Sequence, residues 1–188
     1  TMILGDNIFF GNGLLNLLQS TSNQNLGATI FGYHVNNPSS YGIINFNNDG
    51  NIVSIVEKPK IPKSKYAITG LYFVDGSAPR RARKIKPSKR GELEITTLLN
   101  TYLDEGNLNV KTMGRGYAWF DTGTPTSMLD ASNYVRTLSE RQGLQIGSPD
   151  EVAYNLGWIN EDDLKKRTML FSNTTYGDYL RKLLISEF

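Results

Sequence analysis

The sequence predicts an α/β protein with a mixed sheet, followed by a helical C-terminal region. Runs of β-branched and aromatic residues, which are typical of strands, alternate with leucine-rich segments typical of helices. Such alternation is characteristic of α/β folds. Hydrophobic residues make up 39% of the 188 and charged residues 20%, so the chain can bury a core and is not a wholly disordered protein.

The strand patterns lie in the first two thirds of the chain. Residues 1–4 are apolar and end at Gly5-Asp6, which predicts a buried parallel strand at its carboxyl end. Asn47-Asn48-Asp49-Gly50 predicts a hairpin turn between two strands. An aromatic strand leads into Asp121. We expect further strands over residues 29–35, 41–46, 51–57, 66–74 and 108–113.

The helical patterns become continuous toward the C-terminus. Gly106 is placed to end one predicted helix, and Pro149 fits the first turn of another. We expect helices over residues 12–19, 78–85, 97–105, 125–138, 160–166 and 176–185, with one more beginning near residue 149. The sequence therefore predicts two parts, 1–125 and 126–188.

Composition excludes several classes of protein. With no Cys and one His, the chain has no disulfide framework, thiolate metal site, cysteine nucleophile or histidine-rich zinc site. A net charge of +2, from 20 basic and 18 acidic residues, argues against a nucleic-acid partner. No apolar run is long enough to cross a bilayer and no signal peptide is visible, so we expect no membrane partner and a cytoplasmic location.

Two carboxylates stand out by their position. Asp6 follows Gly5 at the end of a predicted strand, and Asp121 lies between an aromatic strand and Thr122-Gly123. An Asp in such a turn is placed to hold Mg²⁺, which commonly uses only one or two carboxylates. Either Asp could instead cap a helix or a turn.

A second group of residues suits a phosphorylated sugar. In Glu57-Lys58-Pro59 the carboxylate can accept hydrogen bonds from hydroxyls, and the ammonium can bind a phosphate. Arg90 follows a turn and could also bind phosphate. Gly42 would let the backbone approach a ligand closely. Each of these residues could equally belong to a solvated charge pair, a basic loop or a tight turn.

The order of the motifs is more specific than any one of them. The chain closely resembles the glucose-1-phosphate thymidylyltransferases, sugar nucleotidyltransferases of dTDP-rhamnose biosynthesis, from end to end. The resemblance is carried by Leu-Gly-Asp-Asn-Ile-Phe (4–9), Tyr-Gly (41–42), Val-Glu-Lys-Pro (56–59), Thr-Gly-Leu-Tyr-Phe (69–73), Arg-Gly-Glu-Leu-Glu-Ile-Thr (90–96) and Gly-Arg-Gly-Tyr-Ala-Trp-Phe-Asp-Thr-Gly-Thr (114–124).

The resemblance implies a Rossmann-like nucleotidyltransferase sheet and a reaction in which dTTP and glucose 1-phosphate give dTDP-glucose and pyrophosphate. It implies Mg²⁺ ligands at Asp6 and Asp121, with Gly42 and Glu57 binding glucose hydroxyls. It further implies that Lys58 and Arg90 bind and orient the sugar phosphate, and that Tyr72 and Trp119 line the sugar pocket.

The resemblance also implies a homotetramer with a second, regulatory nucleotide site. The residues that fall on the motifs of that site are Phe10, Gly11, Gly114, Arg115 and Glu151. Where the family often has Arg, this chain has Asn155, so a bidentate phosphate contact is lost. Residues 126–188 would serve oligomerisation and regulation.

The family begins with a Gly-rich triphosphate-binding loop that has no counterpart in residues 1–188. We therefore expect residues 1–125 to form a partial catalytic domain that lacks its N-terminal strands. Because positioning of the triphosphate dominates such catalysis, we expect these residues alone to be nearly inactive.

Three other functions stay open. The protein could use another nucleotide or another sugar phosphate. It could be a non-catalytic fragment that binds sugar phosphate or oligomerises. It could also bind nucleic acid through the basic residues between positions 80 and 90.

Overall fold

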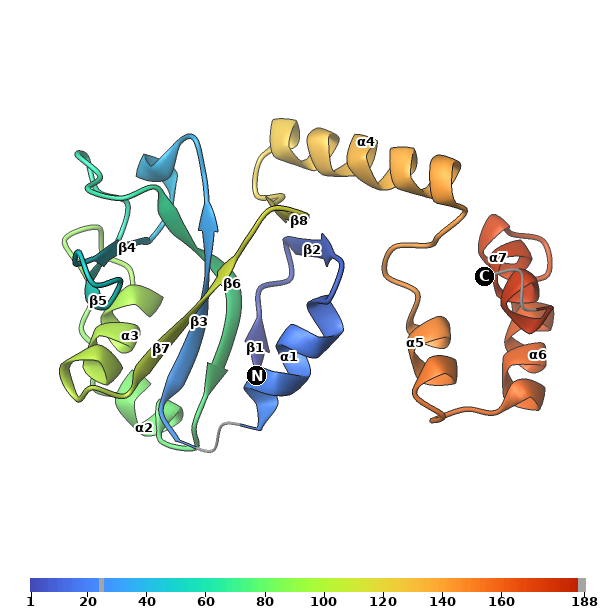
Figure 1. Ribbon diagram of the computed structural model, residues 1–188, viewed down its shortest axis with the longest axis horizontal. Helices are drawn as coiled ribbons and strands as arrows, with labels where there is room; N and C mark the ends of the chain where they lie inside the picture. The colour runs from blue at the N-terminus through green and yellow to red at the C-terminus, as the bar shows by residue number, and fades with distance from the viewer. Residues whose placement is uncertain (24–25, 186–188) are drawn as a thin grey trace. The chain divides into compact units, whose positions relative to one another are not determined.

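The computed structural model describes residues 1–23 and 26–185, and over these residues the chain splits into two compact units, Thr1–Pro125 and Thr126–Phe188. The first unit contains strands and helices, and the second contains helices (Figure 1). The first carries β1 (Met2–Ile3), β2 (Asn7–Gly11), α1 (Leu14–Ser22), β3 (Ala28–His34), β4 (Ile43–Phe46), β5 (Ile52–Val56), β6 (Tyr66–Val74), α2 (Ala78–Ala82), α3 (Ile95–Asp104), β7 (Leu108–Met113) and β8 (Tyr117–Asp121).

The main sheet is built around β6. In the described part of the chain its strands follow the order β5-β4-β6-β3-β7, and β1 lies beside β6. Strands β1, β3 and β4 run antiparallel to β6, whereas β3 and β7 are parallel, so the predicted mixed α/β sheet is confirmed. Strand β2 pairs with β8 in a separate antiparallel ribbon.

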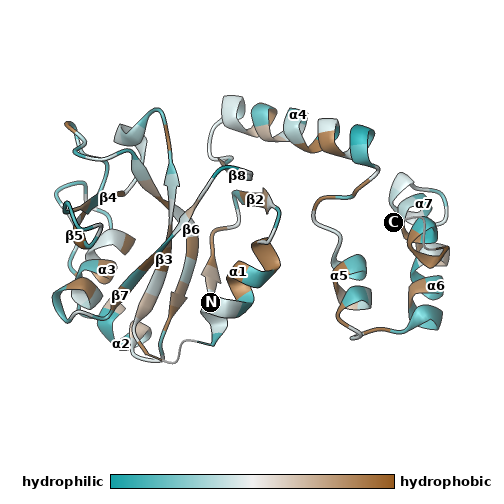
Figure 2. Cartoon of the chain, in the orientation of Figure 1, coloured by the Kyte–Doolittle hydropathy of each residue, from teal (hydrophilic) through white to brown (hydrophobic). Residues whose placement is uncertain are grey.

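Successive side chains of a strand point to opposite faces of the sheet. Each face of this sheet carries an apolar cluster that a helix covers. On one face, Leu98, Leu99 and Tyr102 of α3 pack in a cluster with Ile30 and Ile68. On the other, Phe31, Leu71 and Met113 form a cluster that leucines of α1 contact. Apolar residues accordingly run along β6 in Figure 2.

The helical unit carries α4 (Pro125–Gln142), α5 (Pro149–Asn155), α6 (Glu161–Leu170) and α7 (Thr175–Leu184). Helices α5, α6 and α7 begin at side chains that accept a hydrogen bond from a backbone N–H of the first turn, those of Ser148, Asn160 and Thr174. Leu164, Tyr179 and Leu180 form the core of this unit. Over the described ranges, no helix combines the length and the apolar character needed to cross a membrane.

Several sequence predictions need correction. The strand predicted over residues 1–4 is not a buried parallel strand: β1 is antiparallel to β6, and Met2 and Ile3 are 40% and 57% exposed. Strand β2 was missed, because its residues follow a Gly-Asp turn that we assigned to the loop after the strand. The helix predicted over residues 78–85 ends at Ala82, and the one predicted from residue 97 begins at Ile95.

Asp75 ties together four parts of the first unit. Its carboxylate accepts hydrogen bonds from Gly27 N at 2.9 Å, from Ser77 N and Oγ at 2.8 and 2.5 Å, and from the Tyr102 hydroxyl at 3.0 Å. These bonds, above all that of the Ser77 hydroxyl, hold the pKa of Asp75 well below its usual range. The ionised carboxylate thereby connects the end of β6 to the starts of β3 and α2 and to α3.

Replacement Asp75→Asn should lower the free energy of unfolding at pH 7 by about 1–3 kcal/mol, because an amide nitrogen would face N–H and O–H donors. Folding lowers the pKa of Asp75, so its carboxylate stabilises the folded protein at pH values above the pKa that this group has in the unfolded chain. That stabilisation is lost as the pH falls toward the pKa of the folded state. The difference from the unsubstituted protein should therefore shrink below roughly pH 4. Urea unfolding at pH 7 and pH 3 measures it, and Asp49→Asn in the exposed β4–β5 turn is the control. An equal loss at both pH values would contradict this role.

Candidate active site

A gap in the pairing of β6 creates the candidate site. Strand β4 pairs with β6 at Tyr66 and Ala67, and β1 pairs with it at Leu71 and Tyr72. Both strands lie on the side of β6 opposite β3, because β3 occupies the other edge. On this edge of β6, residues 68–70 have no strand partner and bind other groups instead.

Those partners come from the chain segments that leave the sheet. Ile68 N donates to Gly42 O at 2.8 Å, and Leu4 N donates to Gly70 O at 2.8 Å. Gly70 N donates to the side chain of Asn7, at 3.0 Å from Oδ1. These bonds hold the segments on either side of the gap.

A cavity of about 170 Å³ lies over this gap. Six of the residues predicted to bind sugar phosphate or metal line it: Gly42, Glu57, Lys58, Tyr72, Trp119 and Asp121. The cavity is also lined by residues to which the sequence analysis gave no role: Leu4, Asn7, Ser40, Tyr41, Ile68, Gly70, Ile95 and Thr96. Six of these, Leu4, Asn7, Tyr41, Gly70, Ile95 and Thr96, lie inside the motifs quoted above, and that position was the signal that could have identified them.

The ribbon of β2 and β8 brings the two aspartates together. Asn7 pairs with Asp121 in the ladder, and both N and Oγ1 of Thr122 donate to Asp6 O at 2.8 Å. A Cβ placed on Gly123 would lie 3.1 Å from Asp121 Oδ1 and 3.5 Å from Asp6 Oδ2. The two carboxylates thus border one small space beside Gly123.

This arrangement fits a divalent cation. Mg²⁺ takes carboxylate oxygens at about 2.1 Å and commonly needs only one or two of them, with phosphates and water completing its shell. Among the described residues, no group of three or more His, Asp or Glu side chains could form a larger metal site.

Arg90 lies beside the cavity through its contacts with carboxylates. Its Nη1 is 3.6 Å from Glu57 Oε1 and 3.6 Å from Glu94 Oε1, and its Nη2 is 3.0 Å from Glu92 Oε2. Glu57 lines the cavity, so Arg90 is within reach of a ligand that contacts Glu57. The structure thus brings Arg90 close to Glu57, the neighbour of Lys58 in the chain, and leaves their binding of phosphate a prediction.

Lys58 has an unusual backbone. Its φ of 37° lies in the left-handed region, which non-glycine residues rarely adopt. Its N–H donates to Tyr41 O at 3.1 Å, which holds the strained turn in place. Such strain concentrates at functional sites.

Aromatic side chains form one wall of the cavity. The Trp119 ring lies 5.1 Å from that of Tyr41 and 5.7 Å from that of Tyr33. Burial, with smaller contributions from Glu57 and Asp121, raises the pKa of Tyr72 to about 12, so its hydroxyl stays protonated. Burial and Asp121 also raise the pKa of Tyr41. The wall offers apolar ring faces and hydroxyl donors, which suits a sugar.

A family model described as nucleotidyl transferase matches residues 1–137. The chain belongs to the nucleotidyl transferase family. Glucose-1-phosphate thymidylyltransferase of Xanthomonas campestris pv. campestris (strain B100) is 48% identical over 182 residues, 97% of this chain and 62% of the relative. The enzyme of the same name from Mycolicibacterium smegmatis is 49% identical, over 99% of this chain and 64% of the relative.

Solved structures support the nucleotidyl transferase fold. A Bacillus anthracis protein assigned as a glucose-1-phosphate thymidylyltransferase, in complex with a sucrose, matches with a TM-score of 0.61 and 41% identity, over 71% of this chain and 53% of that one. UDP-glucose pyrophosphorylase complexed with UDP-glucose has a TM-score of 0.59 and 22% identity, over 72% of this chain and 55% of that one. At this low identity, the likeness supports a shared fold and nothing more. The chain spans somewhat less than two thirds of the curated relatives.

The residues predicted to be regulatory fall in two places in this nucleotidyl transferase chain. Phe10 and Gly11 of β2 pair with Ala118 and Tyr117, and Gly114 and Arg115 line a cavity of about 490 Å³ with Tyr33, His34 and Tyr66. Glu151 belongs to the helical unit, where it accepts a hydrogen bond from the Tyr179 hydroxyl at 2.7 Å. A regulatory role for these residues stays a prediction.

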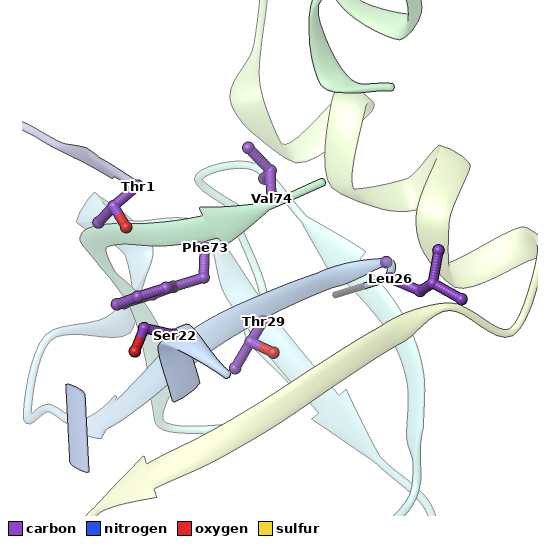
Figure 3. A pocket seen from close by; sticks show the side chains of 7 residues that line it. Thr1, Ser22, Leu26, Thr29, Phe73 and Val74 are labelled. Carbon is purple, nitrogen blue, oxygen red and sulfur yellow. The ribbon is translucent and has the colours of Figure 1, made fainter. Parts of the chain in front are cut away.

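Another cavity, of about 150 Å³, carries no ionisable side chain (Figure 3). The residues that line it are Thr1, Ser22, Leu26, Gly27, Thr29, Phe73 and Val74. None of the residues predicted to bind sugar, phosphate or metal lines this cavity.

Gly42→Ala should disturb the active-site cavity directly. The new Cβ would lie 2.8 Å from Thr96 Cγ2 and 3.3 Å from Glu57 Oε2, closer than normal packing allows. We expect the free energy of unfolding to fall by about 1–3 kcal/mol, as for other overpacked sites. Urea unfolding measures this loss.

The matched control is Gly76→Ala, where a Cβ would meet nothing within 4 Å. It should change the free energy of unfolding by no more than about 0.5 kcal/mol. Equal losses in the two variants would show that the close approach at Gly42 does not matter.

Proposed function

We propose that the protein is a glucose-1-phosphate thymidylyltransferase and that these residues form the sugar-phosphate half of its site. The single observation that carries the proposal is the cavity over residues 68–70 of β6. Its lining includes Glu57, Lys58, Trp119 and Asp121. The relatives that are 48–49% identical support this choice of nucleotide and sugar.

In the proposed reaction, a phosphate oxygen of glucose 1-phosphate attacks the α-phosphorus of dTTP. The bond from that phosphorus to the bridging oxygen breaks, and pyrophosphate leaves with the bonding electron pair. No protein nucleophile is needed, which suits a chain with no Cys. The protein contributes by positioning and by electrostatic stabilisation.

The residues of the cavity divide this work. Glu57 accepts hydrogen bonds from glucose hydroxyls, while the close backbone at Gly42 shapes the pocket beside it. Lys58 and Arg90 bind the phosphate and orient its attacking oxygen. Trp119 and Tyr72 cover the faces of the sugar ring.

Asp6 and Asp121 would hold Mg²⁺ in this proposal. The bound ion would supply neutralisation of the negative charge that develops on the phosphate oxygens. Thr122 donates to the backbone carbonyl of Asp6, and Gly123 N donates to Asp121 Oδ1, which supports the close placement of the two residues.

We also propose that the protein is a cytoplasmic homo-oligomer. Support for an oligomer comes from apolar side chains left exposed in the helical unit, including Trp158 and Met169 at 74% and 73%. Exposed apolar groups of this size often mark interfaces between chains. A role in dTDP-rhamnose biosynthesis follows from the product, dTDP-glucose.

Binding of glucose 1-phosphate to the 188-residue chain tests the sugar-phosphate half. We expect saturable binding by calorimetry, weakened at least tenfold in Lys58→Gln and in Glu57→Gln, because each loses one charge-assisted contact. Lys60→Gln is the control, since Lys60 is exposed nearby and does not line the cavity. Glucose without phosphate should bind much more weakly. Absence of binding at millimolar glucose 1-phosphate, or equal losses in all three variants, would refute the assignment.

Removal of either aspartate tests the cation site. Asp6→Asn and Asp121→Asn should each weaken the binding of Mn²⁺, a paramagnetic substitute for Mg²⁺, by roughly tenfold or more, because each removes a charged oxygen ligand. Electron paramagnetic resonance measures the free ion. Asp104→Asn, on an exposed part of α3, should leave the affinity unchanged.

A further inference from the structure

Asn7 has side-chain contacts that reach both ends of the candidate active site. Its Oδ1 accepts a hydrogen bond from Trp119 Nε1 at 2.6 Å and another from Gly70 N at 3.0 Å. Its Nδ2 donates to Asp6 Oδ1 at 2.9 Å. One short amide therefore joins the sugar-pocket wall, the gap in β6 and one of the metal-site carboxylates.

The partners leave the amide only one orientation. Trp119 Nε1 and Gly70 N are donors without acceptor capacity, so they must face the oxygen of Asn7. The carboxylate of Asp6 accepts, so it must face the nitrogen. Turning the amide over would break all of these bonds at once.

Gly70 provides the space for this side chain. A Cβ placed on Gly70 would lie 2.5 Å from Asn7 Oδ1 and 2.6 Å from Asn7 Cγ. Any other residue at position 70 would therefore push the Asn7 side chain away. The backbone N–H of Gly70 takes the Asn7 side chain as its acceptor just beyond the last ladder pair of β1.

The bond to Asp6 selects which carboxylate oxygen is available. Asn7 holds Oδ1 of Asp6, while Oδ2 is the atom that lies beside Gly123 and Asp121 Oδ1. A carboxylate held on one oxygen keeps the other in a defined direction. Residues that hold a metal ligand in this way are commonly worth a factor of 10–100 in metal affinity.

We propose that Asn7 is a positioning residue that fixes the Trp119 ring and the Asp6 carboxylate relative to each other. The part of this proposal that concerns Asp6 and the cation rests on the proposed function, whereas the part that concerns the Trp119 ring does not. The same Asn7 amide thus fixes the position of the Trp119 ring and the direction of Asp6 Oδ2. A displacement of one is therefore transmitted to the other.

Nuclear magnetic resonance of the indole N–H groups tests the Trp119 part. The chain has two Trp residues, and Trp158→Phe assigns the two signals. In Asn7→Leu, which has nearly the same size but no amide, the Trp119 N–H should exchange with solvent roughly tenfold faster and shift upfield, because its hydrogen bond is lost. Gly70→Ala should produce the same change by displacing the Asn7 side chain.

Asn7→Asp keeps the hydrogen-bond acceptor at position 7 and removes the donor. A carboxylate oxygen at position 7 can still accept from Trp119 and Gly70, so the indole signal should stay close to that of the unsubstituted protein. Faster exchange and an upfield shift in Asn7→Asp as large as those in Asn7→Leu would overturn the assigned contact.

Titration with Mn²⁺ alone tests the cation part. The ion should broaden the Trp119 indole signal of the unsubstituted protein, and the midpoint should rise roughly tenfold in Asn7→Leu. Equal midpoints would overturn the positioning role. If Mn²⁺ leaves the unsubstituted protein unchanged while the exchange rates behave as expected, the cation site of the proposed function fails and the Trp119 contact stands.

Asn100→Leu is the matched control for general destabilisation. Asn100 lies in the same unit and donates to Ile55 O at 3.1 Å, away from the cavity. It should alter neither the Trp119 exchange rate nor the Mn²⁺ midpoint. A change in Asn100→Leu as large as that in Asn7→Leu would show that the effect is not specific to Asn7.

Discussion

Strand β6 is the constraint on which the rest of the first unit depends. It pairs with β3 along one edge and with both β4 and β1 along the other, so it holds together segments that are far apart in sequence. Because neither β4 nor β1 pairs with residues 68–70 on its edge of β6, the backbone there binds Gly42, Leu4 and the side chain of Asn7 instead. A strand that continued through this gap would take these groups into a ladder and fill the cavity.

The charges around the gap are those that the proposed phosphorylated sugar and divalent cation would need. The carboxylates of Asp121 and Glu57 both contribute to raising the pKa of Tyr72, so negative charge faces the cavity. Positive charge comes from Lys58, which lies in a strained turn, and from Arg90, which lies in a loop and contacts the Glu57 carboxylate. A ligand with hydroxyls, a phosphate and a bound divalent ion can satisfy all of these groups together.

Much of the fold could be predicted from local patterns. The strands at 66–74 and 108–113 were predicted with the bounds that the structure has, because each lies near turn residues and holds several residues that favour strands, although Gly70 interrupts the first. The helices of the C-terminal region were predicted near where they lie, two of them from Pro125 and Pro149, although α4 extends to Gln142 and α6 to Leu170. Strand β1 was misjudged because apolar composition alone does not tell a buried strand from an exposed one, nor parallel from antiparallel pairing.

By itself, the sequence determined the class of fold and the family, and it pointed to candidate site residues, including Asp6, Glu57, Lys58 and Asp121, whose roles stay predictions. These follow from residue types and their order along the chain. Only the tertiary structure decided that Arg90 meets Glu57, that Thr96 closes on Gly42 and that Asn7 joins Trp119 to Asp6. Each of these contacts depends on strand register and on side-chain direction. Both are set by long-range pairing with β6 and β8, which no local pattern in the sequence encodes.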